Sequence, residues 1–264
     1  MECLKCIKLL VIKMKNKMSV VLISALLIIL FIFTMYLFMQ RIPVLGYHGF
    51  YKTEVETKGA YVANINDFEE QMKYLNDHHY KTLSMDDYYC WKEKKCKMPR
   101  KSVVITFDDG YKNNYSYAFD ILKKYDFKAT VFVIGGYLNS ENYLSTEEIN
   151  QIKKDYPNIE FASHTYNMHD YDLNGKTKEI IENDISDMKK VIDTPYIAYP
   201  FGLHNDLMKK IYKENGYKLA FGFGPDSKDF RKSKRNDDNY NIPRLCIDGN
   251  MSINKFKLRL LLPF

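Results

Sequence analysis

Apolar and polar positions alternate in blocks along most of the chain. Short runs rich in β-branched and aromatic residues recur from residue 43 onward, and turn or helix signals separate them. Runs of this kind predict buried strands. The predicted strands cover residues 43–45, 103–107, 130–134, 159–162, 196–199, 219–223 and 242–245.

Amphipathic segments lie between these strands and predict helices. The signals are a capping box at Asn66 and Glu69, a second at Ser145 and Glu148, apolar faces over 181–192 and 207–212, and a helix-ending Gly216. Strand–helix alternation favours a parallel sheet, either open or closed into a barrel. In both architectures the functional site lies at the carboxyl ends of the strands. We find no internal repeat or linker, so this part of the chain is predicted to be one domain.

The run 18–39 contains no charged residue. A helix of that length spans roughly 33 Å, enough to cross a bilayer. A buried core helix and a cleaved signal peptide are the alternatives. Uniform hydrophobicity argues against the first, and the absence of a small-x-small cleavage site in 38–41 argues against the second. We therefore expect a transmembrane signal anchor at 18–39, between a basic cytoplasmic tail at 1–17 and an extracytoplasmic domain at 40–264 on the cell surface.

Charge and cysteine content exclude some functions. The formal net charge is +6, but five lysines precede the apolar run and the remainder is close to neutral. The basic balance is therefore no argument for nucleic acid binding. Cys3 and Cys6 fall on the cytoplasmic side, where thiols stay reduced. Cys90 and Cys96 can pair outside the cell only if the segment between them is not one continuous helix.

The most informative motif is Thr106-Phe107-Asp108-Asp109-Gly110, which directly follows a predicted strand. Adjacent carboxylates at a strand end point in different directions, so one can bind a metal while the other acts on a nearby water. Gly110 allows a sharp turn after them. The alternative is an ordinary Asp-Asp-Gly turn that caps the next helix.

Two histidines, His164 and His169, follow another predicted strand. Together with Asp109 they would form a set of two histidines and one carboxylate with a position open for water, as in catalytic zinc sites. The same ligand set suits non-haem iron oxygenases. Asp108 favours hydrolysis, because an oxygenase has no evident need of a base there.

Two further strand-end segments contribute candidates. Residues 198–202 read Ala-Tyr-Pro-Phe-Gly, a turn suited to presenting a backbone N–H into a cleft, although it is also an ordinary turn sequence. His48 follows the first predicted strand of the domain, on the same edge as the other motifs. That position makes it a candidate acid.

These four segments together resemble the NodB-homology polysaccharide deacetylases, carbohydrate esterase family 4, over roughly residues 42 to 256. The histidine spacing is most similar to the branch that contains the poly-N-acetylglucosamine deacetylases of biofilm formation. The resemblance implies a distorted (β/α)7 barrel and a divalent metal, with zinc favoured, on Asp109, His164 and His169. It also implies Asp108 as the general base and the backbone N–H of Phe201 as an oxyanion donor.

The chain departs from the family pattern at two places. Ala198 stands where the family has an arginine that orients the base, and Arg244 is a candidate replacement. The family's late histidine is missing from 245–247, and in the resembling branch an early Tyr-His takes its role as acid. That implies His48 as the acid, which requires neighbouring carboxylates to hold its pKa above 7.

The predicted activity is metal-dependent hydrolysis of N-acetyl groups on a cell-surface N-acetylglucosamine polymer, with the β-1,6-linked polymer favoured. Peptidoglycan deacetylation and an inactive, membrane-tethered glycan-binding module are the alternatives. Both aspartates and both histidines are retained, and binding alone needs no base beside a metal. The expected partners are the polysaccharide and the membrane, with the machinery that synthesises or exports the polymer as a further candidate.

Overall fold

The computed structural model describes residues 19–33, 41–52, 61–222, 231–249 and 251–262. Internal contacts divide the chain into two units, Met1–Gln40 and Arg41–Phe264. In the first unit, residues 19–33 form a helix with exposed side chains. The other residues of the predicted anchor, Met18 and 34–39, lie outside the described ranges. Within those ranges, no helix combines the length and the apolar character that crossing a bilayer requires.

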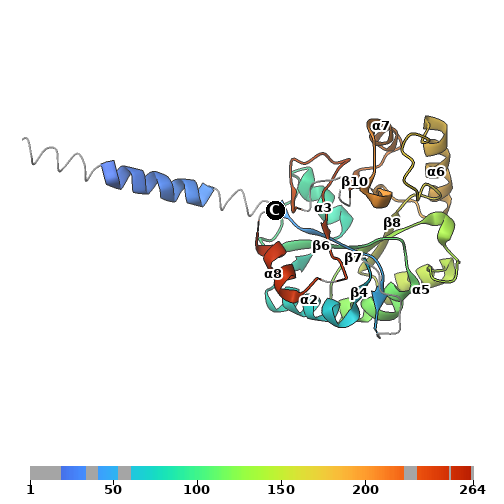
Figure 1. The fold of residues 1–264 in the computed structure, drawn as a ribbon, viewed down its shortest axis with the longest axis horizontal. Coiled ribbons are helices and arrows are strands. Elements are labelled where there is room, and N and C mark those ends of the chain that lie inside the picture. The colour runs from blue at the N-terminus through green and yellow to red at the C-terminus, as the bar shows by residue number, and fades with distance from the viewer. Residues whose placement is uncertain (1–18, 34–40, 53–60, 223–230, 250, 263–264) are drawn as a thin grey trace, which may run out of the picture. The chain divides into compact units, whose positions relative to one another are not determined.

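The second unit is built on a parallel sheet with the strand order β10-β9-β8-β7-β6-β2-β12, and β5 pairs with the start of β6. Figure 1 shows the helices arranged around these strands. The strands are β2 (Val44–Tyr47), β5 (Lys81–Thr82), β6 (Ser102–Phe107), β7 (Ala129–Val133), β8 (Ile159–Ser163), β9 (Tyr196–Ala198), β10 (Leu219–Phe221) and β12 (Leu245–Cys246). Two short pairs lie outside the sheet: β1 (Arg41–Ile42) with β11 (Ser233–Lys234), and β3 (Phe50–Tyr51) with β4 (Ala63–Asn64).

The segment 242–246 contacts both ends of this sheet. Ile242 forms a bridge with Phe221 at the end of β10, and β12 then pairs with β2. The parallel strands thereby curve into an α/β half-barrel. The strand predicted at 242–245 is in fact Leu245–Cys246, because Pro243 has no N–H to continue a ladder. Phe223, the predicted end of another strand, lies outside the described residues.

Helices connect most of the strands. They are α2 (Ile65–Asp77), α3 (Met85–Lys92), α4 (Phe119–Lys124), α5 (Thr146–Asp155), α6 (Lys178–Val191), α7 (Asp206–Glu214) and α8 (Ile253–Leu261), with short π or 3-10 turns η1 (Asn114–Ala118), η2 (Gly135–Tyr137) and η3 (Pro200–Gly202). The capping box at Ser145 and Glu148 is confirmed, and Gly216 follows α7 with a positive φ as predicted.

The capping box predicted at Asn66 and Glu69 is wrong. Helix α2 begins two residues earlier, and Asn64 caps it by accepting a hydrogen bond from the backbone N–H of Asn66. The earlier start places Ile65 on the buried face of the helix. The Glu69 carboxylate instead forms an ion pair with Lys124, 2.8 Å away.

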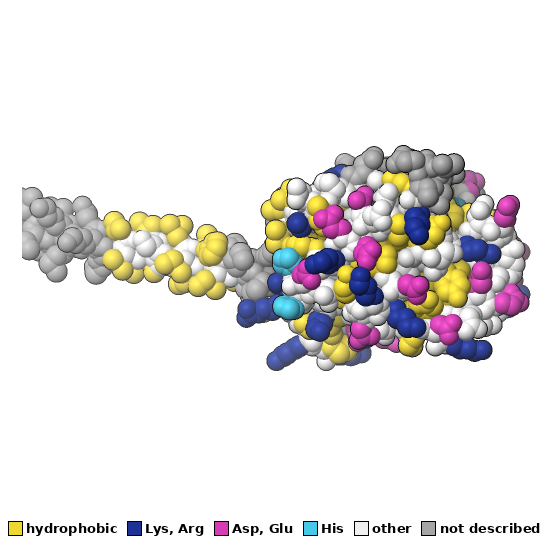
Figure 2. Space-filling view, turned by 90° about the horizontal axis from the view of Figure 1, so that it is seen from below, with side chains coloured by type: hydrophobic (Ala, Val, Ile, Leu, Met, Phe, Trp, Pro, Cys, Tyr) yellow, Lys and Arg dark blue, Asp and Glu magenta, His cyan; other side chains and the backbone are white. Residues whose placement is uncertain are grey.

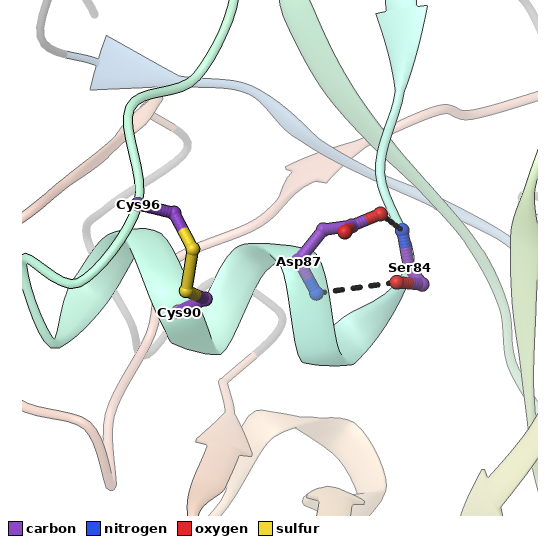
Figure 3. The surroundings of a disulfide bond; sticks show 4 residues. All are labelled: Ser84, Asp87, Cys90 and Cys96. Atoms are coloured by element: carbon purple, nitrogen blue, oxygen red, sulfur yellow. Dashed lines mark hydrogen bonds between the residues drawn. A yellow bond between two sulfur atoms is a disulfide. The ribbon is translucent and has the colours of Figure 1, made fainter.

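Cys90 and Cys96 are joined by a disulfide, which Figure 3 shows at the end of α3. Helix α3 begins with a capping box between Ser84 and Asp87 and ends at Lys92. The segment between the two cysteines is therefore not a continuous helix, so the condition set by the sequence is met.

On the face of the protein in Figure 2, acidic and basic side chains are interspersed, and no single charge sign dominates the view.

Candidate active site

The predicted site residues meet at the carboxyl-end edge of the half-barrel. Because all of these strands run parallel, the residues that follow them collect on one edge. His48 follows β2, Asp108 and Asp109 follow β6, His164 and His169 follow β8, and Phe201 follows β9. Arg244 instead precedes β12 and reaches Asp108 through its side chain.

Asp109 lies between the two histidines. Its Oδ1 atom is 3.4 Å from His164 Nε2 and 3.3 Å from His169 Nε2. One ligand atom from each of the three residues lies within 4.8 Å of the other two, a spacing that could hold a metal ion. Asp109 adopts a left-handed backbone, with φ of 70°, and Gly110 continues in that region with φ of 78°. This sharp turn separates the direction of the Asp109 side chain from that of Asp108.

The hydrogen bonding of His164 fixes which nitrogen faces Asp109. Nδ1 lies 2.8 Å from the carbonyl oxygen of Ala198, which can only accept, so Nδ1 carries a proton and donates it. Nε2 then directs either a lone pair or a second proton at the Asp109 carboxylate. A lone pair facing a carboxylate oxygen is repulsive unless a cation lies between them. The arrangement therefore fits a metal ion in the way that imidazole ligands usually bind one.

Protonation is the alternative to the metal at this position. Burial lowers the pKa of His164, but the Asp108 and Asp109 carboxylates raise it, and the net pKa lies above the usual value. For Asp109, burial raises the pKa while hydrogen bonds from His164 and His169 lower it, so that the carboxyl stays ionised. The three residues thus form an anionic pocket for a single positive charge.

Asp108 has a different partner. Its two oxygens accept hydrogen bonds from Arg244 Nη1 at 2.7 Å and Nη2 at 2.8 Å, and both side chains are buried. The guanidinium also donates to the Thr106 hydroxyl and, through Nε, to the Gly222 carbonyl. Burial raises the pKa of Asp108, whereas the charges of Arg244, His164 and His48 lower it, and the net pKa is below its usual value. Arg244 thus lies where the sequence suggested a replacement for the missing arginine.

His48 lies beside this pair. Its Nε2 is 3.9 Å from Asp108 Oδ2, and its ring centroid is 5.0 Å from that of Tyr61. Burial lowers the pKa of His48 more than Asp108 and Asp109 raise it, so the net pKa is below its usual value. The sequence made the role of His48 as acid conditional on neighbouring carboxylates holding its pKa above 7, and in the free protein burial of the ring outweighs them.

Phe201 occupies a strained position next to the histidines. Its φ of 56° lies in the left-handed region, which non-glycine residues adopt at a cost. The ring centroid is 4.7 Å from that of His169, and on another side Phe201 stacks on Tyr171 at 3.9 Å. The structure thus places the residue next to a candidate metal ligand.

Asp184 supports the histidine loop and was missed by the sequence analysis. This buried side chain on α6 accepts hydrogen bonds from the backbone N–H groups of Tyr166 at 2.9 Å and Asn167 at 2.6 Å. Those amides lie between the two histidines. A signal was present, because Asp184 interrupts the apolar face formed by Ile181 and Ile185. A carboxylate on a buried helix face needs hydrogen-bond donors, here the backbone of the loop.

Comparison with known proteins identifies the class. The polysaccharide deacetylase sequence pattern matches residues 95–220. A poly-β-1,6-N-acetyl-D-glucosamine N-deacetylase of Staphylococcus aureus is 34% identical over 217 residues, which cover 76% of this chain and 72% of that protein. The Streptococcus pyogenes deacetylase PplD, solved in complex with acetate, aligns with a TM-score of 0.74 and 27% identity over 84% of this chain and 99% of that one.

A more distant structure shares the fold. IcaB from Ammonifex degensii aligns with a TM-score of 0.68 and 22% identity, over 84% of this chain and 96% of that chain. The half-barrel is therefore that of the deacetylases. The chain belongs to the polysaccharide deacetylase family, as its resemblance to the NodB-homology enzymes implied, and is a hydrolase of that family.

Proposed function

We propose that this enzyme removes N-acetyl groups from poly-β-1,6-N-acetyl-D-glucosamine with the help of a divalent metal, for which zinc is the favoured candidate. The observation that carries the proposal is the convergence of Asp109, His164 and His169 beside the separately paired Asp108. The five-residue histidine spacing and the name of the Staphylococcus aureus relative favour the β-1,6-linked polymer.

Asp109, His164 and His169 would hold the metal in this proposal. When bound, a divalent ion polarises a carbonyl group and lowers the pKa of water. Two nitrogen ligands and one oxygen ligand form the set that catalytic zinc sites use, and they leave a coordination position open. Asp184 acts on this set indirectly, by fixing the backbone between the histidines.

Asp108 takes a proton from the attacking water. Arg244 keeps this carboxylate ionised and fixes its orientation, and two of its lone-pair sites remain for the water because a carboxylate offers about four. The N–H of Phe201 donates to the oxyanion, an interaction worth about 3–4 kcal/mol in comparable sites. His48 donates a proton to the departing amine. Its pKa must rise in the reacting complex, since burial lowers it in the free protein.

We further propose that 18–39 anchors the enzyme in the cell membrane, with the N-terminus in the cytoplasm and the catalytic unit outside. The basic residues before the apolar run support this orientation. The Cys90–Cys96 disulfide supports an oxidising surrounding for the catalytic unit, because disulfides are rare in the cytosol. Protease added to intact cells should degrade the catalytic unit, and complete protection would contradict this topology.

Acetate release by the full-length chain tests the function. β-1,6-linked and β-1,4-linked N-acetylglucosamine oligomers and peptidoglycan should be compared, each with and without chelator and with metal added back. We expect chelator-sensitive release that is fastest on the β-1,6-linked oligomers. Faster release from peptidoglycan would move the substrate to the cell wall. No release from any of the three, with metal bound, would favour a glycan-binding module.

A further inference from the structure

A pocket of about 670 Å³ opens beside the proposed catalytic residues. Its wall continues directly from them in sequence: Gly49 follows His48, and Tyr111 lies two residues after Asp109. The volume falls in the range of sites that bind small molecules. None of the residues given catalytic or metal-binding roles above lines this pocket. A substrate unit in the pocket would therefore lie next to the reacting unit and not in its place.

Tyrosine rings form a continuous wall between the pocket and the metal site. Tyr111 and Tyr143 both line the pocket, and they stack with their ring centroids 5.1 Å apart and 25° between planes. Tyr137 packs against Tyr143 at 5.1 Å and lies 6.0 Å from the ring of His169. Tyr111 and Tyr143 are only partly buried, and Tyr137 is 37% exposed. Rings that fill a core would be covered, whereas these leave aromatic surface open to a ligand.

The pocket is held in shape by hydrogen bonds. The side chain of Asn113 accepts from the Phe50 N–H at 3.2 Å and donates to the Phe50 carbonyl at 2.7 Å. On the opposite side, the Lys112 N–H donates to the carbonyl of Asn142 at 2.9 Å. The wall segments are thus tied to one another across the chain. A ligand would meet a preformed surface and would not have to order these segments on binding.

The chemistry of the lining suits a sugar ring. Aromatic faces can stack on the C–H face of a pyranose, and the exposed Asn142 and Glu141 offer hydrogen-bonding groups at the rim. The cation in the lining, Lys112, has its charge matched by Glu148 at 3.5 Å. A phosphate or a polyanion would find no free positive charge from that lysine. The pocket therefore favours an uncharged, hydroxyl-rich ligand.

We propose that this pocket binds a pyranose unit of the polymer next to the unit that is being deacetylated, so that the enzyme acts best on several linked sugars. This inference rests on the proposed function, because it takes the polymer as the substrate. Tyr143 is the specificity-determining residue of the subsite. Its ring is shared by the pocket and by the tyrosine wall that leads to His169.

The test compares a short and a long substrate. kcat/KM would be measured for N-acetylglucosamine itself, which has no neighbouring unit to place in the pocket, and for the β-1,6-linked pentamer, with the wild type, Tyr143→Ala and Tyr143→Phe. Tyr80→Ala is the matched control, because Tyr80 is a partly buried tyrosine just before β5, at the amino-end edge of the sheet. Thermal melting of each variant shows whether it is folded.

We expect the pentamer-to-monomer ratio of kcat/KM to fall about tenfold in Tyr143→Ala, the size of one lost aromatic contact. Tyr143→Phe, which keeps the ring, should lose less, and Tyr80→Ala should keep the wild-type ratio. A folded Tyr143→Ala enzyme with the wild-type ratio would overturn the subsite while leaving the deacetylase function intact.

Direct binding separates the two proposals. Calorimetric titration with the pentamer gives a Kd that does not depend on turnover. If the wild type binds the pentamer but releases no acetate, the proposed function fails, and the subsite is still decided by whether Tyr143→Ala weakens binding about tenfold. Equal affinities of the wild type and Tyr143→Ala would overturn the subsite in either case.

Discussion

The two sides of the catalytic centre differ in how they balance negative charge, although the aspartates that define them are adjacent in sequence. On one side Asp108 is neutralised within the protein by the two hydrogen bonds from buried Arg244. On the other side Asp109 faces the two imidazoles, whose charge depends on protonation. The charge of Asp108 is therefore balanced by a cation of the protein itself. The charge of Asp109 is balanced only when a histidine is protonated or a metal ion binds, so this side is suited to binding a metal ion.

The largest effect should come from neutralising either aspartate, with different consequences. Asp108→Asn should lower kcat about 10³- to 10⁴-fold with full metal occupancy, because the base is lost while the metal ligands remain. Asp109→Asn should lose the metal itself, because an amide cannot offset the positive charge. Metal content by mass spectrometry, measured beside acetate release, separates the two. Near-wild-type activity in Asp108→Asn would refute the assignment of the base.

Removing Arg244, the cation that pairs with Asp108, should lower the free energy of unfolding. Arg244→Met leaves the Asp108 carboxylate buried without its partner and should cost about 3–5 kcal/mol of unfolding free energy. Arg231→Met is the matched control. Arg231 also donates two hydrogen bonds to an aspartate, Asp237, but at a more exposed position. Its loss should cost about 1 kcal/mol or less. Urea denaturation measures both.

The pH dependence of this stability has a defined sign. The pKa of Asp108 is lowered in the folded protein, so the contribution of the pair is present above the usual carboxyl pKa of about 4 and is lost as pH falls below it. The difference between wild type and Arg244→Met should therefore shrink in acid. A difference that stays constant down to pH 3 would contradict the ion-pair account.

The position of the centre was predictable from the sequence, because parallel strands are continuous apolar runs and functional residues follow their carboxyl ends. Strands β6, β7 and β8 fall within a residue or so of their predicted limits. Asp109, His164 and His169 each follow such a run, so their meeting at one edge was predictable too. Local pattern therefore carried the strands and the convergence of the three residues of the proposed metal site.

The partners of those residues were harder to predict. Arg244 reaches Asp108 across 136 positions, and no periodicity signals a contact of that separation. The lowered pKa of His48 depends on burial of its ring, which lies next to Tyr61 and Asp108. Asn64 and Asn66 are both suitable N-cap residues for α2. Asn64 is the cap because the helix then includes the buried Ile65, and the sequence alone does not reveal that burial. Arg244 was named only by comparison with the family pattern, and the burial of His48 and Ile65 is tertiary information that no local pattern carries.

The metal-binding side should respond to pH at milder values than the Arg244 side. The pKa of His164 is raised above its usual value of about 6.5, and a proton on Nε2 competes with the metal. The apparent metal affinity should therefore fall about tenfold per pH unit below that pKa and level off above it. Competition with a chelator at several pH values between 5 and 8 measures the slope. An affinity that is constant over this range would show that His164 is not a ligand.

The smallest effect should come from Asp184, which fixes the backbone between His164 and His169. In Asp184→Asn, one oxygen becomes an NH₂ group that points at backbone N–H donors, so at least one of the bonds to Tyr166 and Asn167 is lost. The loop between the histidines then loosens, and metal affinity should fall about tenfold, the lower end for residues that orient ligands. Asp187→Asn is the control, because Asp187 lies on the same helix but is half-exposed and, among the described residues, forms an ion pair with Lys190. If both variants bind metal like the wild type while Asp184→Asn merely melts earlier, Asp184 supports the fold and not the ligands. A loss of affinity in Asp184→Asn alone, at a temperature where it is fully folded, would show that the open side of the centre depends on a carboxylate that touches neither the metal nor the substrate.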